Sequence, residues 1–323
     1  MTGLLVATGD GVARIDVDAG AVTARALEGA RVQCVASDPA RARVAYAGCR
    51  GQGLWRSEDG GAIWEDCALP AEDVFSVAIS PVDGRVYAGC EPSMLFASVQ
   101  GNGGWEELET LRAIPSAPRW SFPPRPWTSH VRWIAPSPHE AGLLLVGIEL
   151  GGVMRTEDGG RTWQDHRPGA KLDAHELAWH PLASGRAYEA AGDGAAWSVD
   201  GGETWTPADS GRNRGYVWAL AVDPLDPDTW YVSASPGPYQ AHGERHADAF
   251  VYRWRGSGPW EPLEGALSGP LEVMPYALAA SADELVVGMR DGRVFVGEDY
   301  GDGWRLVGSG PLVERIVALC LVA

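Results

Sequence analysis

The chain has 323 residues, of which 45% are hydrophobic and 21% charged, so it can bury a large core and is not disordered throughout. Its 26 basic and 43 acidic residues give a formal net charge of −17, which argues against nucleic acid and anionic membranes as partners. It contains no run of about 18 apolar residues, so no segment is expected to span a bilayer.

Two further features of the sequence predict a cytoplasmic protein. The first residues, MTGLLVATGDGVARID, contain neither a basic segment nor a small-residue cleavage site, so they do not resemble a signal peptide. The five cysteines are odd in number and form no CxxC motif, and we interpret them as reduced thiols in the core.

A repeated segment organises the whole chain. It is an apolar run followed by a short polar stretch with Pro, as in VQCVASDP (32–39) and VWALAVDP (217–224). Seven copies end at residues 39, 81, 138, 181, 224, 282 and 323, so most are 41 to 43 residues apart. Short β runs separated by turn residues lie between them, as in ARVAYAG (42–48) and GLWRS (53–57). This spacing is typical of four-stranded propeller blades, and seven copies predict seven blades.

The two ends of the chain predict how the ring closes. The runs LLVAT (4–8), VARIDV (12–17) and AVTARAL (21–27) resemble strands two to four of a blade, whereas the final IVALCLV (316–322) resembles a first strand. The last strand is therefore expected to complete the N-terminal blade, which removes exposed sheet edges. The prediction is an all-β, single-domain, seven-bladed propeller spanning residues 1–323.

A second motif, S-x-D-G-G-x-x-W, recurs in register with the first. Good copies start at Ser57, Thr156 and Ser198, and a weaker copy surrounds Asp299. The motif resembles the Asp-box, or BNR repeat, of sialidases, xyloglucan-cleaving glycosidases, sortilin-type receptors and photosystem II assembly-factor-like propellers. This resemblance implies a propeller fold but selects no function, because hydrolases, receptors and assembly factors all carry the motif.

The aspartates of this motif are expected to be structural, because such a carboxylate can accept backbone N–H bonds inside a tight turn. The four residues concerned are Asp59, Asp158, Asp200 and Asp299. The alternative is that one of the first three is catalytic.

Two insertions of about 15 residues each interrupt the regular spacing. Residues 112–130 precede the first strand of blade 4, and residues 235–250 join strands two and three of blade 6. Both are expected on the top face, by which we mean the loops that enter the first strands and the loops between second and third strands. Long loops often carry function, so a functional rim is predicted there; the alternative is two loops without such a role.

Charged, histidine and aromatic side chains gather at the predicted top of blades 4 to 6. In an enzyme, the candidate acid, base or nucleophilic residues are His130, Glu149, Asp173, His175, Glu176 and Tyr216. Ligand contacts are assigned to two arginines that suit an anionic group and to four aromatic residues that suit a flat one: Arg132, Arg214, Trp127, Trp218, Tyr239 and Tyr276.

Four of the seven histidines map to the same region: His130, His175, His242 and His246. Imidazoles from neighbouring strands can bind a divalent metal, with Glu149 or Asp173 as an oxygen ligand or as an orienting group. The alternative is that these histidines are exposed or hydrogen-bonded in polar loops.

Two functions remain open at this point. The first is an enzyme, hydrolase-like of the glycosidase type or lyase-like, with a top-face pocket for a small polar or glycan-like ligand. The second is a non-catalytic propeller that binds a peptide or protein. True sialidase activity is not expected: the Arg-Ile-Pro signature of those six-bladed enzymes precedes the first Asp-box, whereas the nearest match here is Arg112-Ala113-Ile114-Pro115.

Overall fold

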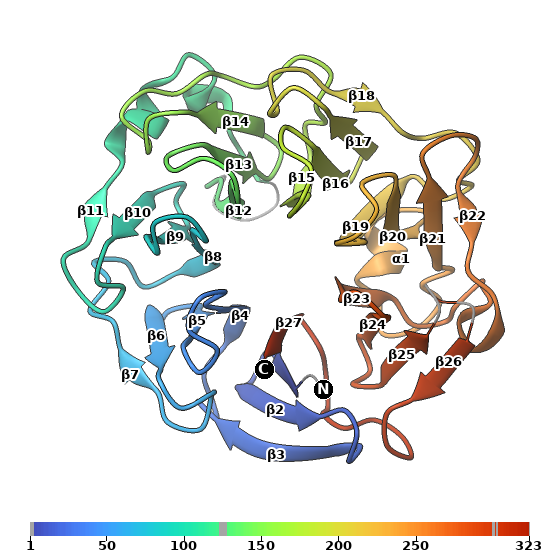
Figure 1. Cartoon of the computed structure of the whole chain (residues 1–323). Coiled ribbons are helices and arrows are strands. Elements are labelled where there is room, and N and C mark those ends of the chain that lie inside the picture. The colour runs from blue at the N-terminus through green and yellow to red at the C-terminus, as the bar shows by residue number, and fades with distance from the viewer. Residues whose placement is uncertain (1–2, 123–127, 299–300, 302, 323) are drawn as a thin grey trace.

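The computed structural model describes residues 3–122, 128–298, 301 and 303–322. Seven antiparallel sheets stand around a central axis as the blades of a propeller (Figure 1). The seven-bladed, all-β prediction is therefore confirmed. Among the described residues, no helix is long and apolar enough to cross a membrane.

Each blade runs outward from an innermost strand. The innermost strands are β27 (Ala318–Val322), β4 (Val32–Ser37), β8 (Val74–Ile79), β12 (Val131–Pro136), β15 (Ala174–Trp179), β19 (Tyr216–Val222) and β23 (Pro275–Ala280). The second strands are β1 (Gly3–Ala7), β5 (Ala45–Cys49), β9 (Val86–Cys90), β13 (Leu144–Ile148), β16 (Ala187–Ala191), β20 (Thr229–Ser235) and β24 (Glu284–Met289). Every innermost strand coincides with one copy of the repeated segment.

The outer half of each blade is less regular. The third strands are β2 (Val12–Asp16), β6 (Leu54–Ser57), β10 (Leu95–Ser98), β14 (Gly152–Thr156), β17 (Gly194–Ser198), β21 (Phe250–Arg255) and β25 (Val294–Glu298). The outermost are β3 (Ala21–Ala26), β7 (Glu65–Asp66), β11 (Glu106–Glu107), β18 (Thr206–Pro207), β22 (Glu261–Pro262) and β26 (Gly303–Leu306). In blade 4 a single bridge between Arg155 and Gln164 takes the place of the fourth strand.

The core lies between adjacent blades, which explains why second strands are apolar on both faces. Strands β5, β9, β13 and β16 are buried at every position. Gly89 in β9 shows how closely the blades approach: a Cβ there would lie 2.5 Å from a side-chain carbon of Val131 in the next blade. A small residue at this point lets the innermost strand of blade 4 pack directly against blade 3.

The ring closes as the sequence predicts. The last strand, β27, pairs antiparallel with β1, with Gly3 opposite Val322 and Ala7 opposite Ala318. The two chain ends lie side by side near the axis (Figure 1). A further hydrogen bond, from Ser37 Oγ to the carbonyl of Leu321 (2.9 Å), ties the completed blade to its neighbour.

The S-x-D-G-G-x-x-W segments form tight turns between third and fourth strands. In the second complete copy, Asp158 accepts hydrogen bonds from the backbone N–H of Thr162 (2.9 Å) and from the hydroxyls of Thr162 (2.7 Å) and Thr156 (2.8 Å). These hydrogen bonds, those from Thr162 foremost, lower the pKa of Asp158 to about 2. Asp59 and Asp200 make equivalent contacts, and Asp299 lies outside the described residues.

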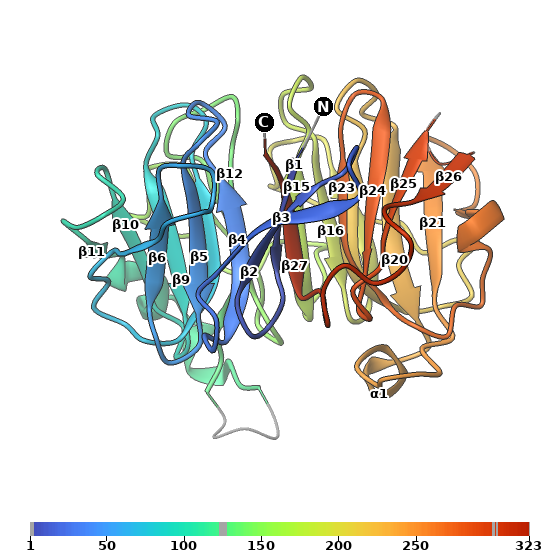
Figure 2. The same cartoon turned by 90° about the horizontal axis from the view of Figure 1, so that it is seen from below.

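The described parts of the two insertions lie before β12 and between β20 and β21. A 3-10 helix, η1 (Glu109–Ala113), ends at the start of the first insertion, and a second, η2 (Ala117–Arg119), lies within it, ahead of β12. The second insertion contains α1 (Pro238–Ala241) between β20 and β21; a third 3-10 helix, η3 (Gly265–Leu267), follows β22. Figure 2 draws α1 and the top face at its lower edge, with the chain ends at the opposite edge.

Candidate functional site

The innermost strands surround a central cavity of about 310 Å³. Six side chains from six different blades line its top end: Gln33, Phe75, Arg132, His175, Trp218 and Tyr276. Each is the second residue of its copy of the repeated segment, and Val317 occupies the same place in the seventh copy. The repeat therefore presents one variable side chain per blade to the cavity.

A β-bulge explains how these side chains reach the cavity. In six of the seven innermost strands, the register with the second strand shifts at this residue, as between Val131 and Trp133 around Arg132 and between Ala174 and Glu176 around His175. A bulge leaves one residue out of the ladder and turns its side chain away from the sheet. The bulges thus point these residues toward the axis while the flanking apolar residues stay in the core.

Glu149 follows β13 and contacts two basic side chains of the site. Its Oε2 lies 2.6 Å from His130 Nε2 and 3.6 Å from Arg132 Nε. Burial alone would raise the pKa of Glu149, but the hydrogen bond with His130 and the charge of Arg132 outweigh it and lower the pKa to about 2. Glu149 is therefore a buried carboxylate anion. His130 is itself held in place, stacked on the ring of Phe75 at 4.1 Å.

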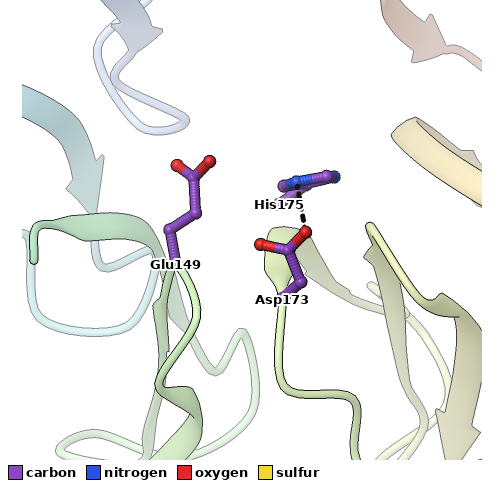
Figure 3. Close-up of side chains that lie close together, drawn as sticks. All are labelled: Glu149, Asp173 and His175. Atoms are coloured by element: carbon purple, nitrogen blue, oxygen red, sulfur yellow. Dashed lines mark ion pairs between the residues drawn. The ribbon is translucent and has the colours of Figure 1, made fainter. Parts of the chain in front are cut away.

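His175 and Asp173 lie close to Glu149, which comes from the neighbouring blade, and His175 also lines the cavity (Figure 3). His175 Nδ1 lies 2.6 Å from the carbonyl oxygen of Val217, and its Nε2 lies 3.6 Å from Asp173 Oδ2. Burial lowers the pKa of His175 to about 4, while burial and the charge of Glu149 raise the pKa of Asp173 to about 7. The imidazole is therefore neutral near pH 7.

Aromatic rings form the remaining wall of the site. The guanidinium of Arg132 lies over the ring of Trp218, 4.7 Å from its centre, and the ring of His175 lies 4.7 Å from the same indole. His242, which follows α1, contacts the hydroxyls of Tyr216 (2.8 Å) and Tyr276 (2.5 Å) through its two ring nitrogens. The second insertion thus packs against blades 6 and 7 at the rim.

The structure brings together many, but not all, of the residues predicted for the site. Glu176 lines the cavity, where burial raises its pKa to about 8, and accepts a hydrogen bond from the backbone N–H of Leu220. Arg214 is instead paired with Asp248, at 2.6 Å. Tyr239 on α1 is 90% exposed. Trp127 lies outside the described residues.

The four histidines predicted as a metal site have different surroundings. His130 contacts Glu149, His242 contacts two tyrosines, and His246 is exposed with a backbone φ of 66°. Among the described residues, the one group of three potential ligand atoms within 4.8 Å of one another is formed by Glu149, Asp173 and His175.

Glu189 in β16 is a buried polar residue that the sequence analysis did not single out. Its Oε2 accepts a hydrogen bond from the backbone N–H of Lys171 (3.0 Å), two residues before Asp173, while Oε1 has no hydrogen-bond partner in the described part of the chain. Burial, more than the nearby charge of Asp193, raises its pKa well above 4.5. A lone Glu inside an otherwise continuous apolar second strand, Ala187–Ala191, was the available signal.

We expect Glu189→Gln to stabilise the protein at pH 8 but not at pH 4. A carboxyl group whose pKa is raised on folding favours the folded state at low pH, and this contribution is lost as pH rises above 4.5 toward the folded-state pKa. The variant should melt roughly 5 °C above the wild type at pH 8. Thermal melts across this range test it, with the exposed Glu28→Gln as control. Parallel pH profiles for wild type and Glu189→Gln would contradict the assignment.

Comparison with known proteins gives the fold but no closer assignment. No protein-family model matches this sequence, and no curated protein sequence matches it either. The structure resembles a GH74 xyloglucanase from Xanthomonas campestris, with a TM-score of 0.71 and 17% identity over 98% of this chain and 52% of that chain. An ancestral GH74 enzyme matches with a TM-score of 0.66 and 18% identity over 85% of this chain and 38% of that chain. The chain thus spans about half or less of these proteins.

Two further solved structures are similar over most of both chains. YCF48 bound to D1 peptide matches with a TM-score of 0.58 and 18% identity, over 86% of this chain and 81% of that chain. A functionally unknown protein from Desulfotomaculum acetoxidans matches with a TM-score of 0.65 and 14% identity, over 99% and 98%. At such identities the similarity is one of fold.

Proposed function

We propose that the top of the central cavity binds a glycan-like ligand and that the polar groups at its mouth support hydrolase-like chemistry on it. The observation that carries this proposal is that three polar side chains from two blades lie close together. Glu149, Asp173 and His175 place reactive atoms within 4.8 Å of one another, and His175 lines the central cavity. A broad docking rim would not need such a cluster.

The walls of the cavity fit a sugar. Trp218 and Tyr276 offer aromatic faces for the apolar side of a sugar ring, and Gln33 and Arg132 offer hydrogen-bond donors for its hydroxyls. The nitrogens Arg132 Nε and His130 Nδ1 are buried without a hydrogen-bond partner among the described residues. Buried polar atoms of this kind are costly unless a ligand or water satisfies them.

The fold comparisons support the same ligand class. The GH74 protein from Xanthomonas campestris is described as a xyloglucanase, so a propeller of this fold takes part in glycan cleavage there. In glycoside hydrolysis the oxygen of water bonds to the anomeric carbon, the glycosidic C–O bond breaks, and the leaving oxygen takes up a proton. The two neighbouring carboxyl groups of Glu149 and Asp173 suit these proton movements.

A second candidate is a scaffold that binds a peptide. YCF48, which has the same fold, is described bound to D1 peptide. In this chain Tyr239 on α1 is 90% exposed and offers an aromatic contact that a peptide could use.

Incubation with defined oligosaccharides tests the primary proposal. We expect saturable binding, seen as quenching of tryptophan fluorescence, from at least one of three probes: xyloglucan oligosaccharides, cello-oligosaccharides and oligogalacturonides. New reducing ends without an unsaturated product would indicate hydrolysis, whereas an ultraviolet-absorbing unsaturated product would indicate a lyase. Absence of binding to all three sugar classes would contradict the proposal and leave the peptide scaffold.

A further inference from the structure

His175 has the surroundings of a metal-binding histidine. A carbonyl oxygen can only accept a hydrogen bond, so the 2.6 Å contact with Val217 requires the proton of His175 on Nδ1. This fixes Nε2 of the neutral ring as a lone-pair donor. His175 is 1% exposed, and its Nε2 has no hydrogen-bond partner among the described residues. Metal-ligating histidines characteristically use one nitrogen this way, with a backbone carbonyl or carboxylate holding the other.

Two carboxyl groups lie near this nitrogen. One oxygen of Glu149 and one of Asp173 lie within 4.8 Å of each other and of a ring nitrogen of His175, and Asp173 Oδ2 lies 3.6 Å from Nε2 (Figure 3). The contacts of Glu149 with His130 and Arg132 both use Oε2, so Oε1 makes no hydrogen bond among the described residues. Three groups with lone pairs therefore lie close together, and a positive charge between them would relieve their mutual repulsion.

From this arrangement we infer that Glu149, Asp173 and His175 hold one divalent transition-metal ion at the mouth of the cavity. The role of this ion in catalysis rests on the proposed function. The binding of the ion, however, can be measured without any sugar. A mixed set of one imidazole and two carboxylates suits Zn²⁺, Mn²⁺ or Fe²⁺ better than Ca²⁺ or Mg²⁺, which prefer oxygen alone.

The dimensions of the cluster are compatible with such an ion. Ligand atoms about 2.1 Å from a metal lie roughly 3–4 Å from one another. The three ligand atoms lie within 4.8 Å of one another, so side-chain shifts of about 1 Å would bring them into this range. His130, bonded to Glu149, and the Val217 carbonyl, bonded to His175, would orient two of the three ligands. The ion would act as a Lewis acid on an oxygen of the ligand.

Titration of chelator-treated protein with ZnCl2, and separately with MnCl2, tests this inference. We expect about one equivalent to bind in the micromolar range or tighter, and Asp173→Asn and His175→Ala each to weaken binding at least tenfold. His139→Ala is the matched control, because His139 lies on the opposite face and contacts the His180 carbonyl. Binding should also raise the melting temperature of the wild type. CoCl2 should give visible absorption bands that are lost in His175→Ala.

The outcomes separate this inference from the proposed function. Asp173 is partly exposed, so Asp173→Asn remains informative if His175→Ala fails to fold. No saturable binding by the wild type, or equal weakening by His139→Ala, would overturn the metal site. Sugar cleavage by metal-free protein would overturn the Lewis-acid role of the ion, but not its binding, and would leave the carboxyl groups acting directly. An ion that binds as expected while no sugar binds would sustain the metal site and refute the proposed ligand class.

Discussion

A chain that ends at Val317 should lose cooperative folding. It lacks β27, which forms the innermost strand of the N-terminal blade and pairs with β1 along five residues. The lost strand also removes Val322 and the partly buried Leu319 and Leu321 from the packing around β1. Burying apolar side chains of this size contributes about 1.5–3 kcal/mol each, so the loss is comparable with the whole stability of a typical domain.

Calorimetry and circular dichroism on the truncated chain would show this directly, because the cooperative thermal transition should disappear. A synthetic peptide of residues 316–323 should restore the transition by adding the missing strand, as in other cases of strand complementation. A scrambled peptide of the same composition is the control. If the truncated chain melts within a few degrees of the full chain, ring closure by β27 does not hold the fold together.

Replacing Glu149 by Gln should lower the cleavage of a bound oligosaccharide at least about 100-fold while changing its binding only a few-fold. The variant keeps the shape of the side chain and removes the negative charge that His130 and Arg132 stabilise. Both direct proton transfer and metal binding need that charge, so the rate should fall under either mechanism. Single-turnover rates and binding isotherms with the same sugar separate the two effects.

The matched control for this experiment is Glu65→Gln, an exposed glutamate on β7 at the outer edge of blade 2. Its rate should equal that of the wild type. Equal rates for Glu149→Gln and wild type would exclude Glu149 from the chemistry, and a parallel loss of rate and affinity would assign it to ligand binding alone.

Repetition made the architecture predictable in detail. The seven copies of one segment correspond to seven innermost strands, and the unpaired strands at both ends predict the pairing of β27 with β1. The two longer intervals between copies of the segment also indicate where the insertions occur. Blade 4 departs from the pattern because only a single bridge, between Arg155 and Gln164, forms where a fourth strand was expected.

The site was predictable only in part, because its key contacts join different blades. His175, Glu149 and Asp173 could be placed on the same rim from their position in the repeat. That the Val217 carbonyl fixes the tautomer of His175, or that Asp248 pairs with Arg214, depends on loop paths the repeat does not encode. Equally, nothing in the spacing showed that His242 would contact two tyrosines instead of a shared metal site.

The bulges of the innermost strands allow the ligand selectivity of such a propeller to change without changing its fold. A bulged residue makes no ladder pair, so its side chain can be exchanged with little effect on the sheet behind it. Here the exchangeable positions are Gln33, Phe75, Arg132, His175, Trp218 and Tyr276, each on a separate blade. Ligand selectivity can therefore be varied combinatorially, one blade at a time, which makes this ring a ready framework for libraries of designed binding pockets.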